Sequence, residues 1–275
     1  MKRIIALTMA VLMVVAMLAA CGGKTAETKA DESTAEATAA PAAATADSDA
    51  VKTAGKLVVG ITDFEPMDYK DEKGEWIGFD ADMARAFAES LGVTAEFVEV
   101  DWDNKILELD GGTVDCIWNG MTLTDEVTSA MSCTKPYLDN AQVVVVNKDV
   151  ADKYATADAC KDLTFAVESG SAGQEQAEAN GFKFTEVKDQ ATALMEAASG
   201  TCDGAIIDLL MAKAMVGAGT GYEQLAYTVS LNSEEYGVGF RKGSDLTEKC
   251  NEFFEAKKAD GTIDQLTEKY LVAKS

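Results

Sequence analysis

The sequence predicts an α/β protein of two lobes, each a mostly parallel sheet flanked by helices. Short apolar runs alternate with amphipathic helical segments along most of the chain, which is typical of parallel strands joined by crossover helices. Two extended segments, residues 143–146 and 236–240, are expected to join the lobes as hinge strands. Lobe 1 should consist of residues 55–142 and 237–275, and lobe 2 of residues 143–236.

The composition narrows the possible functions. The 275 residues carry a formal net charge of −23 and include no histidine. Such an acidic surface argues against nucleic acid or anionic lipid headgroups as binding partners. The absence of histidine excludes Ser-His-Asp and Cys-His catalysis and every zinc site that needs a histidine ligand. We expect no metal, no cofactor and a monomer.

The first twenty residues are expected to be a signal peptide. Lys2-Arg3 precede an apolar core at residues 4–17, which is too short to span a bilayer comfortably. Leu18-Ala19-Ala20-Cys21 follows and resembles a bacterial lipobox, which implies that Cys21 carries acyl chains such as palmitate. The lipid would hold the protein at the outer face of the cytoplasmic membrane or in a periplasm. A signal anchor that stays in the membrane is the alternative.

Residues 22–54 are expected to be a disordered tether. They are mostly small and polar, and no aromatic or large aliphatic residue occurs before Val51. Such a segment cannot bury enough apolar surface to offset the entropy of the chain. The tether would let the folded domain reach away from its lipid.

Lobe 1 is expected to begin with a strand, a helix and a second strand. Residues 57–61 form a short apolar run, as in a central parallel strand. A helix follows, with Asp80 as its expected cap and Gly92 at its end. Residues 95–100 should form the next strand.

A polar loop with an aromatic residue, residues 101–104, leads into a short helix at residues 105–109. Its Asp-x-Asp pattern matches the start of a calcium loop. Such loops need glycine at the sixth position and glutamate at the twelfth, where this chain has Ile106 and Gly112. We therefore reject calcium binding.

The next segment is expected to meet a ligand. Residues 116–118 should form a buried strand that ends in a turn at Asn119-Gly120, and residues 121–124 should open a helix with acidic residues in its first turn. A strand that leads into a helix N-terminus exposes N–H groups at the edge of the sheet where open α/β folds bind small ligands. An ordinary crossover without a site is the alternative.

Lobe 2 repeats this arrangement. A strand at residues 164–167 leads through small residues at 168–173 into a helix, which brings backbone N–H groups close to a ligand. A helix at residues 192–199 precedes a strand at 204–207 that ends in Asp208. A buried aspartate is costly unless paired, so Asp208 either caps the next helix or is the counter-ion of a cation.

The end of the chain returns to lobe 1. Residues 235–240, with glycine at alternate positions, should form a strand. Ser244 is expected to cap a helix that runs to Lys258, and the turn at residues 260–262 leads into a last helix that ends near Tyr270.

A series of short motifs follows one another along the folded part: Leu57-Val58-Val59-Gly60, Gly78-Phe79-Asp80-Ala81-Asp82, Asp101-Trp102, Asn119-Gly120-Met121-Thr122-Leu123-Thr124, Lys135-Pro136-Tyr137, Gly170-Ser171-Ala172-Gly173, residues 203–208, residues 236–240 and Asp260-Gly261-Thr262. In this order and spacing they resemble the polar amino-acid family, family 3, of ABC-transporter solute-binding proteins. The resemblance implies the type II two-lobed fold of periplasmic binding proteins. It also implies capture of an amino acid by hinge closure and delivery to an ABC permease in the membrane.

The resemblance implies a ligand site between the lobes. Phe64 and Trp102 would pack on either side of the ligand, and Asp208 would hold its α-ammonium. The other implied contacts are Asn119, Gly120, Met121 and Thr122 of lobe 1 and Ser171, Ala172 and Gly173 of lobe 2. Aromatic faces suit aliphatic stems and cations, and a desolvated carboxylate discriminates strongly for an ammonium. Plain core packing is the alternative for the two rings.

One position departs from the family. Where the family has an arginine for the α-carboxylate of the ligand, this chain has Val127. A carboxylate would then rely on N–H groups at residues 122–124 and 171–173, while Glu168 adds negative charge beside Asp208. We expect a ligand with a cationic end and a weakly required carboxylate, such as a basic amino acid or an amine. An ordinary zwitterion held in another way is the alternative.

Cysteine pairing stays open at this level. Without Cys21 an odd number remains, so at least one thiol is free: the five are Cys116, Cys133, Cys160, Cys202 and Cys250. Cys160 and Cys202 both precede strands of lobe 2 and could pair, and buried reduced thiols are the alternative.

Two other functions stay open. Some members of the family are dehydratases, but this chain has no histidine and no evident acid/base pair. A ligand-sensing domain would need a separate receptor as its partner, since neither a second membrane segment nor a cytoplasmic module is expected after the last helix.

Overall fold

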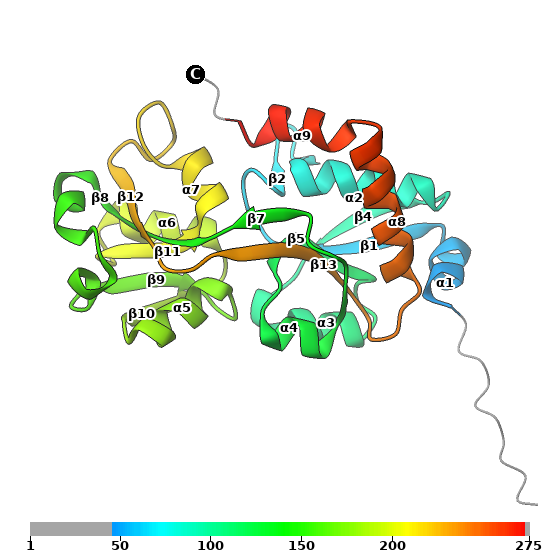
Figure 1. Cartoon of the computed structure of the whole chain (residues 1–275), viewed down its shortest axis with the longest axis horizontal. Coiled ribbons are helices and arrows are strands. Elements are labelled where there is room, and N and C mark those ends of the chain that lie inside the picture. Colours follow the sequence, from blue (N-terminus) through cyan, green and yellow to red (C-terminus); the bar gives the residue numbers. More distant parts are fainter. Residues whose placement is uncertain (1–45, 273–275) are drawn as a thin grey trace, which may run out of the picture. The chain divides into compact units, whose positions relative to one another are not determined.

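The computed structural model describes residues 46–272, and two main sheets organise them (Figure 1). The predicted signal peptide, Cys21 and most of the predicted tether lie outside these residues. The first sheet has the strand order β4 (Thr94–Glu99), β1 (Lys56–Ile61), β5 (Cys116–Thr122), β13 (Glu234–Phe240) and β6 (Ser132–Cys133), and β7 (Leu138–Asn140) pairs with β13. A small separate hairpin joins β2 (Tyr69–Lys70) to β3 (Trp76–Ile77).

Helices cover both faces of the first sheet. α2 (Phe79–Ser90), α8 (Leu246–Ala259) and α9 (Thr262–Tyr270) lie on one face, and α3 (Lys105–Asp110) and α4 (Asp125–Ala130) lie on the other (Figure 1). Buried aromatic rings pack the helices of the first face against each other and against the sheet: the ring centroid of Phe87 in α2 lies 5.3 Å from that of Phe253 in α8 and 6.0 Å from that of Trp118 in β5. As predicted, β1 is a central strand with parallel partners, β4 and β5, and its apolar run is buried because helices cover both faces.

The second sheet has the order β10 (Lys183–Val187), β9 (Thr164–Glu168), β11 (Gly204–Asp208), β8 (Gln142–Asn147) and β12 (Leu225–Ser230). β9 is parallel to β10 and β11, whereas β8 is antiparallel to β11 and β12. α6 (Gln190–Ser199) and α7 (Leu209–Met215) lie on one face and α5 (Ala172–Asn180) on the other (Figure 1). Two 3-10 segments, Lys148–Tyr154 and Ala157–Cys160, follow β8.

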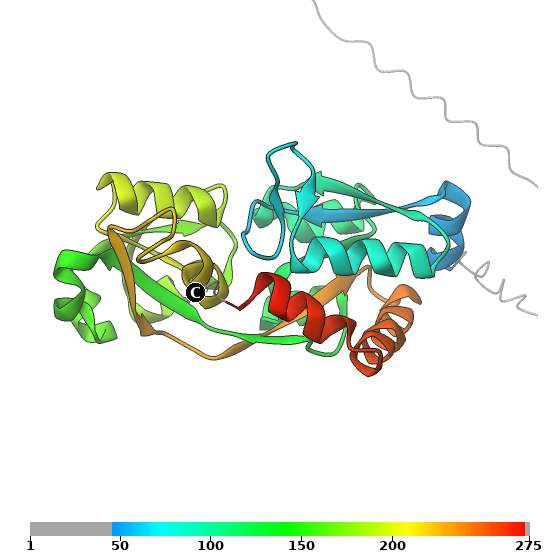
Figure 2. The same ribbon diagram turned by 90° about the horizontal axis from the view of Figure 1, so that it is seen from above.

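Two chain segments cross from one sheet to the other. β7 continues through Ala141 into β8, and residues 231–233 connect β12 to β13; Figures 1 and 2 show these segments as the green and orange ribbons that run between the sheets. Both predicted hinge strands are strands in the structure. The crossings themselves fall just before residue 142 and just before residue 234.

Three local predictions for lobe 1 were wrong. β5 does not turn at Asn119-Gly120 but continues to Thr122, because β13 pairs with it as far as Tyr236. The following helix therefore begins at Asp125, with the Thr124 hydroxyl as its cap. Asp80 does not cap α2, since its buried carboxylate instead accepts hydrogen bonds from the Gly120 N–H and the Tyr137 hydroxyl.

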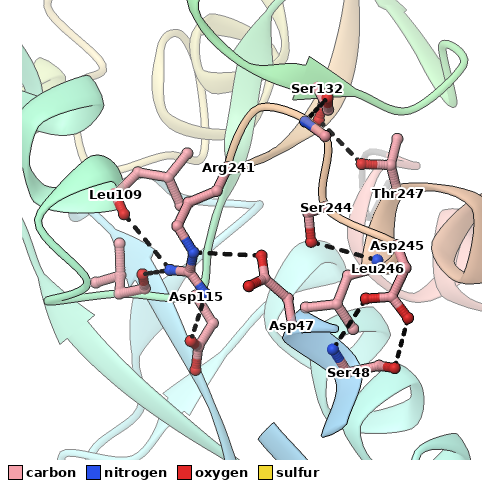
Figure 3. A network of polar contacts seen from close by, with 12 residues as sticks. Asp47, Ser48, Leu109, Asp115, Ser132, Arg241, Ser244, Asp245, Leu246 and Thr247 are labelled. Atoms are coloured by element: carbon pink, nitrogen blue, oxygen red, sulfur yellow. Dashed lines mark hydrogen bonds and ion pairs between the residues drawn. The ribbon is translucent and has the colours of Figure 1, made fainter. Parts of the chain in front are cut away.

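The last residues of the predicted tether are helical, which corrects the prediction of disorder up to residue 54. α1 (Asp47–Ala54) buries Val51 to 2% exposure. Figure 3 shows its polar contacts: Asp47 forms an ion pair with Arg241 at 3.3 Å, and the Ser48 N–H donates to the Asp245 carboxylate at 3.0 Å. These partners lie about 190 residues further along the chain, so composition alone could not reveal them.

A few other expectations concern single residues. α8 begins at Leu246 with Asp245 at its cap position, one residue after the predicted Ser244.

Within residues 46–272 all five cysteines are free thiols: Cys116, Cys133, Cys160, Cys202 and Cys250. None of the helices described combines the length and apolarity needed to cross a membrane.

Candidate functional site

A cavity between the two lobes brings together most of the predicted ligand contacts. Its lining includes Trp102, Asn119, Gly120, Met121 and Thr122 of lobe 1 and Glu168, Ser171, Ala172 and Asp208 of lobe 2. Thr124, whose N–H group was expected to meet a ligand carboxylate, also lines the cavity. Four further lining residues were not predicted as contacts: Lys105, Val127, Gly170 and Gln190. Phe64 and Gly173 lie outside this lining.

Phe64 packs against the lining residue Gly120 but does not itself line the cavity. Its ring is 2% exposed and packs edge-on against Tyr236, with 6.4 Å between the centroids. A Cβ atom on Gly120 would lie 2.6 Å from this ring, and Gly120 has a φ of 55°. The backbone can therefore pass this close to the Phe64 ring, in this conformation, only because residue 120 is glycine.

Glu168 brings an unpaired carboxylate oxygen to the cavity. The residue is 2% exposed at the C-terminal end of β9, and its Oε1 has no hydrogen-bond partner among the described residues. Burial, followed by the charges of the nearby Asp208 and Asp189 carboxylates, raises the pKa of this carboxyl to about 8. An unsatisfied buried carboxylate favours a ligand that donates hydrogen bonds to it.

Asp208 is the second carboxylate of the cavity, and it is held in place by neighbouring side chains. It is 3% exposed and accepts hydrogen bonds from Asn140 Nδ2, Gln190 Nε2 and the Tyr236 hydroxyl. Its side chain does not cap α7, so the helix-cap alternative is wrong. Burial, followed by the charge of Glu234, raises the pKa of Asp208 to about 7.

Glu234 lies beside this site where the chain crosses between the sheets. Its Oε1 accepts from Asn140 Nδ2 at 2.6 Å, Gln142 Nε2 at 2.8 Å and the Thr122 hydroxyl at 3.0 Å. Thr122 is one of the predicted ligand contacts, but its hydroxyl thus donates to another side chain of the protein. The alternating strand pattern of residues 235–240 gave no indication of a buried carboxylate just before it.

Lys105 is the charged lining residue that was not predicted from the sequence. It is 3% exposed, and its Nζ donates to Trp102 O at 3.2 Å and to Gly170 O of lobe 2 at 2.8 Å. The ammonium also lies 5.1 Å from the centroid of the Trp102 ring. Helical spacing could have revealed it, because Lys105 and Leu109 are four residues apart and share the buried face of α3.

The N–H groups predicted to receive a ligand carboxylate differ between the lobes. In lobe 1 the Leu123 N–H donates to Glu235 O at 3.0 Å and the Thr124 N–H to Thr122 O at 2.9 Å, so these two are engaged. In lobe 2 the Ser171 N–H donates to Glu168 O. The N–H groups of Ala172 and Gly173 belong to the first turn of α5 and have no acceptor within that helix.

Val127 is an apolar part of the wall. It is 2% exposed and packs with Trp102, Leu109 and Met121. No group of three potential metal ligands occurs in the part of the chain that the structure describes. The charged groups of the cavity lining are the two carboxylates of Glu168 and Asp208 and the ammonium of Lys105.

Comparison with known proteins agrees with this fold and identifies the family. Residues 57–273 match the family of bacterial extracellular solute-binding proteins, family 3. The L-cystine-binding protein TcyJ of Escherichia coli (strain K12) is 28% identical over 81% of this chain and 85% of its own. The arginine-binding extracellular protein ArtP of Bacillus subtilis (strain 168) is 28% identical over 78% of this chain and 86% of its own.

The solved structures are similar as well. A mutant of ArgBP from T. maritima superposes with a TM-score of 0.76 at 32% sequence identity, over 82% of this chain and 98% of that one. The mixed sheets and their flanking helices thus form the type II two-lobed fold that was predicted. The chain belongs to the bacterial extracellular solute-binding proteins of family 3.

Proposed function

We propose that this protein captures an amino acid with a cationic side chain, or a related amine, for an ABC importer. The observation that carries the proposal is the pair of buried carboxylates in the cavity, Glu168 with an unpaired oxygen and Asp208. Two buried negative charges are costly without a positive partner. A ligand with two cationic groups would offset that cost, whereas an acidic amino acid would increase it.

Capture would proceed by hinge closure, in which the two lobes move about the two crossing segments. The lobe boundaries in this proposal are those predicted from the sequence. Ligand would first contact Trp102 and Gly120 of lobe 1. Lobe 2 would then bring Glu168, Ser171 and Asp208 onto it, and the closed form would be recognised by the membrane permease. A lipid on Cys21 would keep the protein near that permease, outside the cytoplasm. The named relatives are binding proteins, which favours binding without turnover.

A thermal-shift screen tests the ligand class, because a ligand that binds only the native state raises the melting temperature. The chain from residue 22 onwards would be screened against the twenty amino acids, cystine, ornithine and common amines. The proposal expects shifts with arginine, lysine, ornithine or amines. Shifts with only neutral or acidic amino acids would overturn the cationic ligand, and no shift with any compound would overturn the amino-acid function.

A further inference from the structure

Lys105 is the one cationic side chain that lines the cavity within the described residues. Its ammonium bonds only to two uncharged groups, the main-chain carbonyls of Trp102 and Gly170. It forms no ion pair with any carboxylate of residues 46–272. Burial lowers the pKa of this lysine, and nearby carboxylates such as Glu126 and Glu168 oppose that effect. A buried ammonium without an anionic partner is costly.

The ammonium still has a free donor. A lysine carries three N–H donors, and the two carbonyls of Trp102 and Gly170 accept two of them. The third has no acceptor among the described residues, and Lys105 lines the cavity. Because Gly170 belongs to lobe 2, the bond to its carbonyl also joins the lobes across the cavity.

Other groups that could hold a carboxylate are engaged or absent in lobe 1. The N–H groups of Leu123 and Thr124 have acceptors in the protein, and Val127 is apolar. The arginines of the described residues lie outside the cavity lining: Arg85 pairs with Asp82, and Arg241 pairs with Asp47 and Asp115. Lys105 remains as the cation available from lobe 1.

We propose that Lys105 Nζ binds the α-carboxylate of the ligand, in place of the arginine that Val127 replaces. With Glu168 and Asp208 the cavity then offers one positive and two negative groups. An α-amino acid with a cationic side chain carries the complementary set, one carboxylate and two cations. The inference rests on the proposed function and deepens it, since it selects the amino acid over its decarboxylated amine.

Calorimetry with matched ligands tests this role. Arginine and agmatine, or lysine and cadaverine, differ only in the carboxylate. Wild-type protein should bind the amino acid more tightly than the amine. Lys105→Met, which keeps the length of the side chain, should weaken binding of the amino acid by about 10- to 100-fold, as expected for loss of a charge-assisted hydrogen bond. Binding of the amine should stay equal or improve, because a positive charge has left the cavity.

Lys242→Met is the matched control. The Lys242 ammonium also donates only to main-chain carbonyls, those of Thr128, Ser129 and Met131, and the residue lies outside the cavity lining. This variant should leave both affinities unchanged. The melting temperature of each variant without ligand would show whether it is folded.

Each other outcome is informative. Equal loss of affinity for the amino acid and its amine in Lys105→Met would make Lys105 a bridge between the lobes only, and would overturn its role as a carboxylate ligand. Unchanged affinities would overturn it as well. If wild-type protein bound neither basic amino acids nor amines, the ligand class of the proposed function would fail together with this inference.

Discussion

The Glu234 carboxylate accepts a hydrogen bond from Asn140 Nδ2 at 2.6 Å, and the two residues lie at the two places where the chain crosses between the lobes. Asn140 also donates to Asp208. The crossing segments are thus bonded to each other and to a carboxylate of the cavity. This arrangement links the Asp208 carboxylate of the cavity to both crossing segments.

Replacement of Glu234 should therefore reduce stability. Glu234→Gln keeps the shape but places an amide where Oε1 or Oε2 now accepts from side chains, including Asn140, Gln142 and Asn232. Buried donors would lose their acceptor, which we expect to lower the free energy of unfolding by about 2–4 kcal/mol. Denaturant unfolding measures this loss. Glu235→Gln, at an exposed neighbour, should cost under about 0.5 kcal/mol, and an equal cost for both variants would contradict the role of Glu234.

The raised pKa values of Glu168 and Asp208 predict that stability without ligand falls as the pH rises. In the unfolded chain these carboxyls would titrate near their ordinary pKa values of 4.5 and 3.8, whereas in the folded protein burial raises the pKa values to about 8 and about 7. Between these limits the folded state binds more protons than the unfolded chain, so these groups lower the free energy of unfolding as the pH increases. Affinity for a cationic ligand should change in the opposite direction, because binding needs both carboxylates ionised.

Glu168→Gln isolates this effect from that of other carboxyls. Unfolding curves at about pH 5 and about pH 8 should show a smaller loss of stability in the variant than in wild-type protein. Calorimetry should show that the affinity of wild-type protein for a basic amino acid increases over the same interval. A variant whose stability depended on pH as steeply as that of wild-type protein would contradict the assignment to Glu168.

The docked helix α1 gives a further prediction. Val51→Ala removes two buried methyl groups and should lower the free energy of unfolding by about 1–3 kcal/mol. Lys52→Ala changes an exposed residue of the same helix and should have almost no effect. Denaturant unfolding of the chain from residue 22 compares the two. Equal stability of both variants would mean that α1 does not pack on the domain in solution.

The local sequence pattern predicted the structure correctly where the neighbours of a residue in the sequence determine its conformation. The apolar run of β1, the small-residue entry to α5 and the buried strand end at Asp208 were all expected. Most of the residues that line the cavity were named from the resemblance, because motif order also fixes which strand ends meet there.

Prediction failed where distant contacts decide the structure. The continuation of β5 through Gly120 depends on β13, and α1 depends on Asp245. Lys105 was overlooked because lysine is rarely buried, yet the carbonyl groups of Trp102 and Gly170 hold its ammonium. β13, Asp245 and Gly170 all lie too far along the sequence from the residues that they contact to leave a local signal.

Gly120 offers the last prediction, on the wall of the cavity. Gly120→Ala would combine a backbone of φ 55°, which alanine rarely adopts, with a Cβ atom 2.6 Å from the Phe64 ring and 3.1 Å from that of Tyr236. Gly92 is the matched control, because it has a φ of 79° but no atom within 4 Å of an added Cβ. Gly92→Ala should cost about 1 kcal/mol for the backbone alone.

Gly120→Ala should cost about 1–3 kcal/mol more than Gly92→Ala, because Phe64 or the strand must move. It should also weaken ligand binding, since the Gly120 backbone lines the cavity, whereas Gly92→Ala should leave the affinity unchanged. Denaturant unfolding and calorimetry on the two variants measure both effects. Equal destabilisation by both substitutions would show that Phe64 yields without cost, and the rigid support of the cavity wall by that ring would then be disproved.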